Sequence, residues 1–380
     1  MTLVELLVAM IIGLALTLAI TSLLIASENH KRTTTSTNDA EQTGAYAFYA
    51  LDRSLRSAGS SFAESAYVTD RGVMGCKLNA ATIWPRASAL PTPFGTSSFQ
   101  VTSANLRMAP ALIAKNQSLS GTDDVLVVMG GSGAAGGVSR QVTNAGTSTT
   151  LVLDNTVGFL PGDVALVSQS LVSDCLIEQV ASVSGSTLNL GGTYYTAGSS
   201  TTLASLSSST SSYVTPLGNA AANNIQLTLF GVGSNRTLYS YDLLQNLKLV
   251  QGSGADTSQA IADGVDQMHA IYGIDTNGDG IQDNWAGASD AGYDIATVMA
   301  TPATMRTIVA VRVALVMRGQ YPDKNLVSPA TLTLFSGLTN AGGTSLQQTV
   351  NLSANDQNYR YRVFEFTVPL RNMLLLAGGP

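Results

Sequence analysis

The 380-residue sequence predicts an α+β protein in which a long N-terminal helix precedes a large, β-rich globular domain with mainly antiparallel sheets. Three observations predict this class. An uncharged apolar run lies near the start of the chain, helical periodicity continues to about residue 56, and short β-branched runs then alternate with glycine, serine and threonine. Strands that follow one another after short turns favour antiparallel pairing.

The first element is an apolar stretch, residues 1–26, in which Glu5 is the only charged side chain. The uncharged part from Leu6 to Ala26 would form a helix of roughly 30 Å, the thickness of the hydrocarbon core of a bilayer. A secretory signal peptide would show a basic segment, a shorter apolar centre and a small-residue cleavage site, and this stretch shows none of them. We therefore expect residues 1–26 to be retained as a transmembrane half-helix.

Glu5 stands out because an unpaired carboxylate is costly in lipid and usually marks a function. It needs a cationic partner, and the nearest candidate is an α-amino group. In a single straight helix Glu5 is better placed to meet the amino group of another subunit than its own, so stacked copies of the helix would satisfy it. The alternative is an ordinary signal anchor with a chance glutamate.

The helix is expected to continue through residues 27–58 as an amphipathic half. Phe48, Leu51 and Leu55 recur at helical spacing, which predicts one face packed against a globular domain. The run Ser57-Ala58-Gly59 is typical of a helix C-terminus, so the helix should end near residue 56.

Residues 59–380 are expected to form the β-rich headpiece. It contains a Ser/Thr/Gly-rich inserted region near 130–215, whose topology the sequence leaves open. The clearest strand candidates are residues 124–129, 149–153, 163–167, 225–230, 236–241, 306–317 and 361–368.

Charge and residue usage exclude several function classes. The formal net charge of −6 and the pI of about 4.9 argue against a phosphate-binding surface, so we expect no nucleic-acid partner. With only His30 and His269, a histidine-based triad or zinc site has little to draw on, and we expect no catalytic activity. Cys76 and Cys175 predict one disulfide rather than a metal pair, because the apolar helix implies export.

The strongest local motif is a run of alternating oxygen side chains, Asp275, Asn277, Asp279 and Asp283, with Gly280 placed for a sharp turn. Such a loop could bind calcium, and Ile281 could add its carbonyl oxygen. An EF-hand would have glutamate where this chain has Ala286, so the motif is incomplete, although Asp290 could substitute. The alternative is a turn between strands, since Asn-Gly and Asp-Gly are hairpin signals.

The start of the chain carries a first resemblance. Residues 2–7, Thr-Leu-Val-Glu-Leu-Leu, resemble the mature N-terminus of type IV pilins and type II secretion pseudopilins. The resemblance implies cleavage by a prepilin peptidase, methylation of residue 1 and an assembly role for Glu5. Met1 replaces the family's usual phenylalanine. Residue 1 is then expected to be the processed N-terminus, the alternative being that the recorded chain begins at an internal start.

A second resemblance covers more of the chain and points to the PilW family of type IV pilus minor pilins. It rests on Ala58-Gly59, Asp174-Cys175 and residues 272–280, 311–315 and 364–372. This resemblance implies a pilin fold, with the long helix under a β-rich headpiece, and a role at pilus initiation or at the tip. The long Gly/Ser/Thr-rich middle departs from the family pattern.

Together the two resemblances imply a structural subunit of a type IV pilus that serves motility or cell adhesion. The subunit would lie in the bacterial inner membrane before assembly and in an extracellular fimbrium afterwards. Its partners would be other pilin subunits, the inner membrane and the pilus assembly machinery. The alternatives are a J-type pseudopilin of type II secretion and a surface adhesin carried at the pilus tip.

Overall fold

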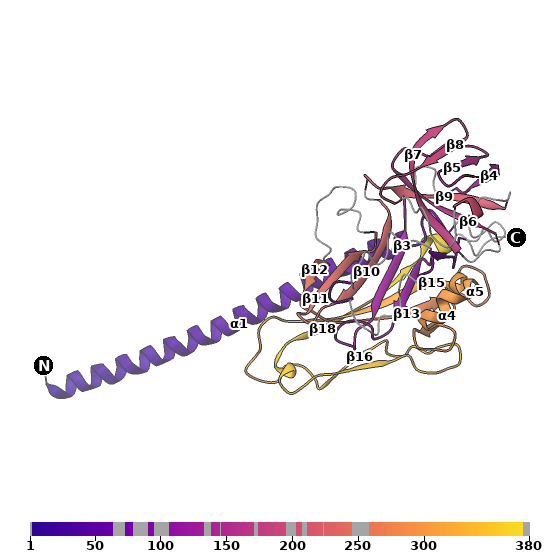
Figure 1. The fold of residues 1–380 in the computed structure, drawn as a ribbon. Helices are drawn as coiled ribbons and strands as arrows, with labels where there is room; N and C mark the ends of the chain where they lie inside the picture. Colours follow the sequence, from indigo (N-terminus) through magenta and orange to yellow (C-terminus); the bar gives the residue numbers. More distant parts are fainter. Residues whose placement is uncertain are drawn as a thin grey trace.

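A computed structural model describes residues 2–63, 73–78, 90–94, 106–132, 138–144, 146–170, 174–194, 203–206, 211–222, 224–244 and 258–374. Figure 1 shows a long helix, α1 (Leu3–Ser57), whose first half projects from a β-rich head domain. This arrangement confirms the predicted α+β class with its N-terminal helix and antiparallel sheets.

Helix α1 comprises 55 residues and is therefore about 80 Å long. It begins after Thr2, whose side chain caps the first turn, and it ends at Ser57, within one residue of the predicted end. The chain leaves the helix through Gly59, whose φ of 77° is a conformation that favours glycine.

The second half of α1 packs on the head domain along one face. Ser36, Gly44, Ala47, Leu51 and Leu55 are buried, three to eight residues apart. At Gly44 the helix backbone passes so close to the sheet that an added Cβ would lie 2.7 Å from the ring of Phe364. Nearby, Phe48 makes an edge-to-face contact with Phe366 at 4.4 Å between ring centroids.

The sheet under α1 has four antiparallel strands in the order β14-β13-β15-β18. Their bounds are β14 (Asn284–Gly287), β13 (Val265–Ile274), β15 (Ile308–Arg318) and β18 (Tyr361–Pro369). The sequence predicts a strand from residue 306, which is wrong by two residues: Arg306 and Thr307 end the short helix α5 (Pro302–Thr307). Pro302 at the helix start supplies the local reason, since its fixed φ suits a first helical turn.

A second, five-stranded antiparallel sheet has the order β12-β11-β10-β3-β2. Its strands are β12 (Gln259–Asp263), β11 (Thr237–Asp242), β10 (Gln226–Val232), β3 (Val125–Gly130) and β2 (Ala111–Ala114). One hydrophobic core joins this sheet, the four-stranded sheet and α1. Within it the amide of Ile113 donates to the hydroxyl oxygen of Tyr272 at 2.6 Å, which ties β2 to β13.

The Ser/Thr/Gly-rich middle contains a small closed β-barrel, which the sequence did not predict. Its strands are β4 (Arg140–Asn144), β5 (Thr150–Leu153), β6 (Asp163–Gln169), β7 (Asp174–Ser184), β8 (Thr187–Leu190) and β9 (Ser212–Asn219). The order β7-β6-β9-β4-β5-β8 closes because the long strand β7 also pairs with β8. A separate hydrophobic cluster that includes Leu151, Val167 and Leu188 fills the interior, so the barrel has its own core.

Most remaining elements are short. They are α2 (Leu203–Leu206), α4 (Ile295–Ala300), α6 (Arg371–Leu374), the 3₁₀ turn η2 (Asp356–Asn358) and the hairpin of β16 (Thr331–Leu334) and β17 (Gln348–Asn351). Another short strand, β1 (Lys77–Leu78), pairs with β7; among the described strand pairs this is the only parallel one. The helices are too short for periodicity to reveal them, although Asp294 is a recognisable N-cap for α4.

Candidate functional site

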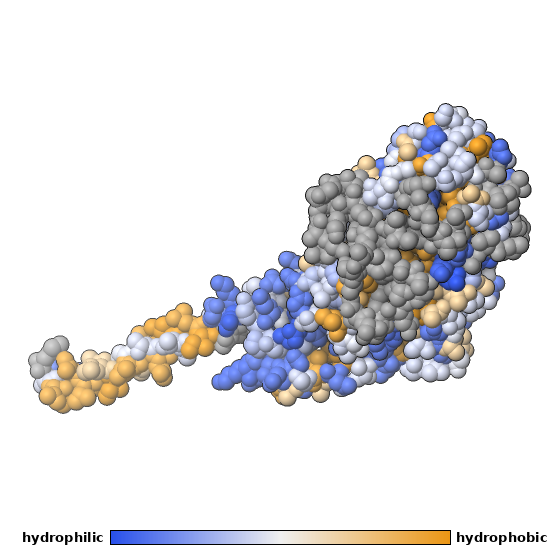
Figure 2. Space-filling model, in the orientation of Figure 1, coloured by the Kyte–Doolittle hydropathy of each residue, from blue (hydrophilic) through white to orange (hydrophobic). Residues whose placement is uncertain are grey.

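The most distinctive surface is the first half of α1. Its apolar side chains are exposed along the whole stretch from Leu3 to Ile25, and Figure 2 shows this half of the helix as mainly hydrophobic, with paler patches, outside the head domain. The helix is long and apolar enough to span a membrane. An apolar surface of this extent is unfavourable in water, so it is expected to be covered by lipid or by other helices.

Glu5 and Thr2 form a reciprocal capping box at the start of this helix. The amide of Thr2 donates to Glu5 Oε2 at 2.8 Å, and the amide of Glu5 donates to Thr2 Oγ1 at 3.4 Å. This contact was not predicted from the sequence, although Thr-x-x-Glu spacing is its signature. The predicted assembly residue Met1 lies outside the described residues.

The structure joins Cys76 to Cys175, the pair that the sequence predicts to form a disulfide. Their Cα atoms lie 5.8 Å apart, a usual separation for such a bridge. The bridge sits where β1 pairs with β7, with Leu78 opposite Cys175. The β1 segment also bonds to residues 106–108, which lead into β2, so the disulfide fastens the barrel to the rest of the head domain.

The predicted calcium loop connects β13 to β14, which pair as antiparallel neighbours. The carboxylate of Asp275 accepts from the amides of Asn277 (3.1 Å), Gly278 (2.6 Å) and Gly280 (2.7 Å). At the other end of the loop, Asp283 Oδ2 accepts from the Thr276 amide and hydroxyl, both at 3.0 Å, and these bonds lower the pKa of Asp283. The loop is therefore a hairpin connection closed by its own side chains.

The remaining predicted ligands point to one another or to the backbone. Asn277 Nδ2 donates to Asp279 Oδ2 at 3.2 Å, and the Ile281 amide donates to Asp279 Oδ1 at 2.8 Å. Throughout the described ranges, no group of three or more His, Cys, Asp or Glu side chains is placed to hold a metal ion. The three aspartates would have to converge further to bind calcium, and calcium binding stays a prediction.

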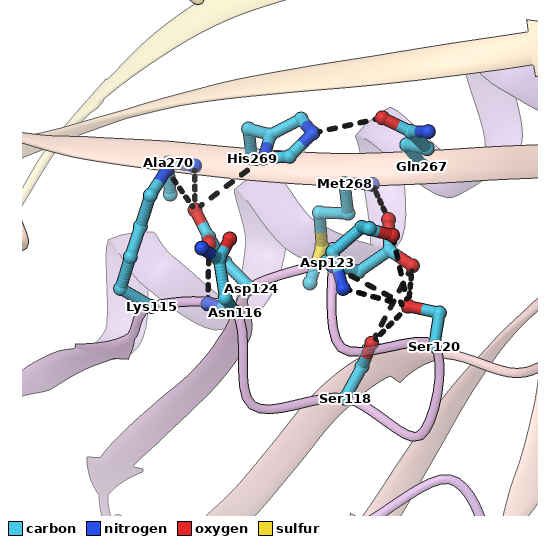
Figure 3. A network of polar contacts seen from close by, with 11 residues as sticks. Lys115, Asn116, Ser118, Ser120, Asp123, Asp124, Gln267, Met268, His269 and Ala270 are labelled. Atoms are coloured by element: carbon cyan, nitrogen blue, oxygen red, sulfur yellow. Dashed lines mark hydrogen bonds and ion pairs between the residues drawn. The ribbon is translucent and has the colours of Figure 1, made fainter. Parts of the chain in front are cut away.

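Two adjacent buried carboxylates, Asp123 and Asp124, tie the β2–β3 loop to strand β13 (Figure 3). Asp123 Oδ1 accepts from the Met268 amide at 3.1 Å, while Asp124 Oδ2 accepts from the Ala270 amide at 2.9 Å. The second oxygen of Asp123 accepts from the hydroxyl of Ser120. The pair therefore connects the five-stranded sheet to the four-stranded sheet.

The buried surroundings shift the pKa values of Asp123 and of the neighbouring His269. Burial raises the pKa of Asp123 to about 6, against the opposing effect of its hydrogen bonds. His269 lies with Nδ1 3.8 Å from Asp124 Oδ2 and with Nε2 3.1 Å from Gln267 Oε1, and burial lowers its pKa. His269 is thus a packed residue of the sheet. The role of Asp123 was not predicted, because the Met268 amide that it binds lies 145 residues away in sequence.

Comparison with known families identifies one region. The family model of the Type IV Pilus-assembly protein W (PilW) matches residues 230–372, from β10 to α6. This region contains three of the five motifs on which the PilW resemblance rests, and it leaves out α1 and the barrel. No curated protein and no solved structure gives a significant match to the chain. The head domain is therefore similar to PilW over residues 230–372, which relates this chain to type IV pilus assembly.

Proposed function

We propose that this chain is a structural, non-enzymatic subunit of a type IV pilus with a pilin fold. One observation carries the proposal: an exposed apolar half-helix with a single carboxylate, Glu5, is joined to a β-rich head that matches the PilW model. The half-helix inserts into the inner membrane before assembly. It then becomes part of the helical core of the filament.

Moving from lipid into a bundle of helices gains little hydrophobic free energy, because both surroundings are apolar. The direction and register of assembly must therefore come from packing and from polar contacts. Glu5 is the ionisable side chain of residues 1–26, and a neighbouring subunit's N-terminal ammonium would neutralise it. The capping box with Thr2 holds the carboxylate at the helix end, where such a neighbour could reach it.

Within the pilus, we assign the subunit to initiation or to the tip. The head domain carries the barrel in addition to the region that matches the family model, and a head of this size is easier to place at the end of a fibre than between packed neighbours. The match to a pilus-assembly model also favours a pilus subunit over a J-type pseudopilin of type II secretion.

Adhesion at the tip is a second candidate role, and the position of the barrel favours it. In Figure 1 the barrel lies at the end of the head domain opposite the projecting half of α1. Two apolar residues of the β5–β6 connection in the barrel, Val157 and Leu160, are 73% and 55% exposed. In a membrane-anchored or tip-located subunit, this end would face outward.

The test is to locate the chain in filaments. Pili sheared from cells are analysed by quantitative mass spectrometry and by immunogold labelling with antibodies against the head domain. A pilus subunit is recovered with the filaments, and a tip subunit labels their ends. Absence from purified filaments, with the chain remaining in the membrane fraction, would refute the proposal.

A further inference from the structure

A groove of about 360 Å³ lies between α1 and the loop that follows β15. The helix contributes Arg32, Thr33 and Ser36, and the loop contributes Tyr321 and Lys324. Arg360, just before β18, completes the wall. The groove is thus built from three segments that are far apart in sequence.

Contacts between these segments hold the groove in shape. The guanidinium of Arg32 lies 5.1 Å above the ring of Tyr321, and Thr33 Oγ1 lies 3.5 Å from Asp323 Oδ1. Arg360 Nε is 2.9 Å from Asp323 Oδ2, close enough for an ion pair, but the buried Nε atom makes no hydrogen bond. The wall of the groove therefore contains a buried guanidinium nitrogen whose hydrogen bond is not satisfied.

The groove carries an excess of positive charge. Arg32, Lys324 and Arg360 line it, and Asp323 is the one carboxylate among its described lining residues. Exposed Lys31 lies beside Arg32 on the helix. Over the described part of the chain, neither Lys31 nor Lys324 has a carboxylate within ion-pair distance. The free positive charges suit an anionic ligand.

The position along α1 indicates which anion the groove would meet. The uncharged run ends at Ala26, so the backbone of Arg32 lies about 9 Å beyond it. Helix side chains tilt toward the N-terminus, which brings the guanidinium back toward a headgroup layer that is roughly 5–8 Å thick. Figure 2 shows hydrophilic side chains where the apolar first half of α1 meets the head domain.

The same loop also presents residues typical of a membrane interface. Tyr321 is 43% exposed and Leu326 is 65% exposed, on either side of Lys324. Tyrosine and lysine favour the boundary between hydrocarbon and water, because each combines an apolar body with a polar end. The loop therefore has the chemistry to rest on a lipid surface.

We propose that the groove formed by Arg32, Lys324 and Arg360 binds the phosphate headgroup of an anionic phospholipid when α1 spans the membrane. This inference rests on the proposed membrane insertion of α1 and adds a specific ligand. The bound headgroup seats the head domain on the bilayer. It must be released when the helix is drawn into a filament.

The test uses the full chain in nanodiscs of phosphatidylcholine mixed with phosphatidylglycerol. Native mass spectrometry of the ejected protein measures how much of each lipid stays bound. Wild type is expected to retain phosphatidylglycerol preferentially, and the double variant Arg32→Gln/Lys324→Gln should lower this retention roughly tenfold to thirtyfold. The matched control is Arg53→Gln/Arg371→Gln, which removes two exposed charges at the other end of α1 and should leave retention unchanged.

Unchanged retention in the groove variant, or an equal loss in the control, would overturn the proposal. Inorganic phosphate is added to the detergent-solubilised full chain as a further probe; if it binds with the same dependence on Arg32 and Lys324 as phosphatidylglycerol does, the lipid assignment is wrong. Alkaline carbonate extraction separates the two proposals. If the proteins stay in the membrane but show no preference for phosphatidylglycerol, only the headgroup site fails; if wild type is extracted, membrane insertion fails.

Discussion

The carboxylate of Glu5 accepts a 2.8 Å hydrogen bond from the backbone amide of Thr2, so in the isolated subunit it is bonded to its own helix end. The bond uses Oε2, and no bond to Oε1 is found among the described residues. A neighbouring ammonium could therefore approach without breaking the cap. In the proposed pilus subunit, the helix cap and the assembly contact would be two separate roles of Glu5, and substitutions can separate them.

Glu5→Gln should keep the cap and lose the assembly contact, because glutamine also serves in a capping box but carries no charge. We expect normal insertion into the membrane and a reduction of about tenfold or more in filament incorporation, as for a truncated buried charge pair. Quantitative mass spectrometry measures the amount of the chain in sheared pili relative to the amount that remains in the membrane fraction. Thr2→Ala is the matched control: it removes the cap, worth about 1 kcal/mol, and should leave incorporation near that of wild type. Equal incorporation of Glu5→Gln and wild type would exclude the charge-pairing model.

The double variant Cys76→Ser/Cys175→Ser should destabilise the head domain. The bridge closes a loop with a sequence separation of 99, and its removal should cost roughly 2–5 kcal/mol of unfolding free energy. Thermal denaturation of the detergent-solubilised full chain measures the loss, and hydrogen exchange should show the largest increase in β7, where the bridge is attached. The control is peptide mapping of the wild-type protein without reductant, which should recover the peptides of Cys76 and Cys175 linked to each other. Recovery of two free thiols would remove this bridge from the fold.

Asp123→Asn should change how stability depends on pH. Burial raises the pKa of Asp123 to about 6, whereas an unfolded aspartate titrates near about 3.9. Between these values the folded state binds more protons than the unfolded state, so the contribution of Asp123 to stability falls as pH rises from about 4 to about 6. Asparagine keeps an acceptor for the Met268 amide and removes the buried charge. At neutral pH the variant should be more stable by on the order of 2 kcal/mol.

Chemical denaturation across this pH range provides the measurement. Asp154→Asn, at an exposed position in the barrel, is the control and should leave the pH profile unchanged. If Asp123→Asn is less stable than wild type at neutral pH, the carboxylate is held in its charged form and the assignment of its pKa is wrong.

What could be predicted from the sequence depends on how local the determining contacts are. Leu51 and Leu55 repeat at helical spacing, which suffices to predict the packed face of α1. Strand β3 is buried at every position, and its continuous apolar run suffices to predict a strand. The barrel closes only because β7 pairs with β6 along one part and with β8 along another, which no local pattern encodes. The apolar runs at residues 149–153 and 163–167 predict single strands, but they do not predict the pairing that closes the barrel.

Among the candidate sites, too, some are evident from local sequence and others depend on contacts between distant residues. Glu5 is conspicuous as a carboxylate in an apolar run, and Cys76 and Cys175 are the only cysteines, so composition alone identifies them. Asp123 and Asp124 look like an ordinary acidic pair before a strand. Their function depends on the amides of Met268 and Ala270, which lie 145 and 146 residues away. The cationic groove likewise exists only after Arg32 and Arg360 are brought together by packing of α1.

Calcium is expected to bind the loop from Asp275 to Asp283 and to stabilise the head domain. The three amides on Asp275 already hold the loop in a tight turn, so binding requires Asp279 and Asp283 to move toward Asp275 rather than refolding of the loop. At a calcium concentration about 100 times the dissociation constant, linkage predicts a stabilisation of roughly 2.7 kcal/mol. Chelation should therefore lower the melting temperature of the full chain, and calorimetry should show heat of binding.

Asp279→Ala should abolish both effects, because it removes the central oxygen ligand, whereas Asp154→Ala should preserve them. The two variants remove the same charge, so a general electrostatic effect on calcium would appear in both. With Ala286 in place of the EF-hand glutamate, binding should be weak and suited to calcium-rich extracellular surroundings. If calorimetry shows no heat and chelation leaves melting unchanged, the loop is a hairpin turn whose aspartates serve only its own backbone.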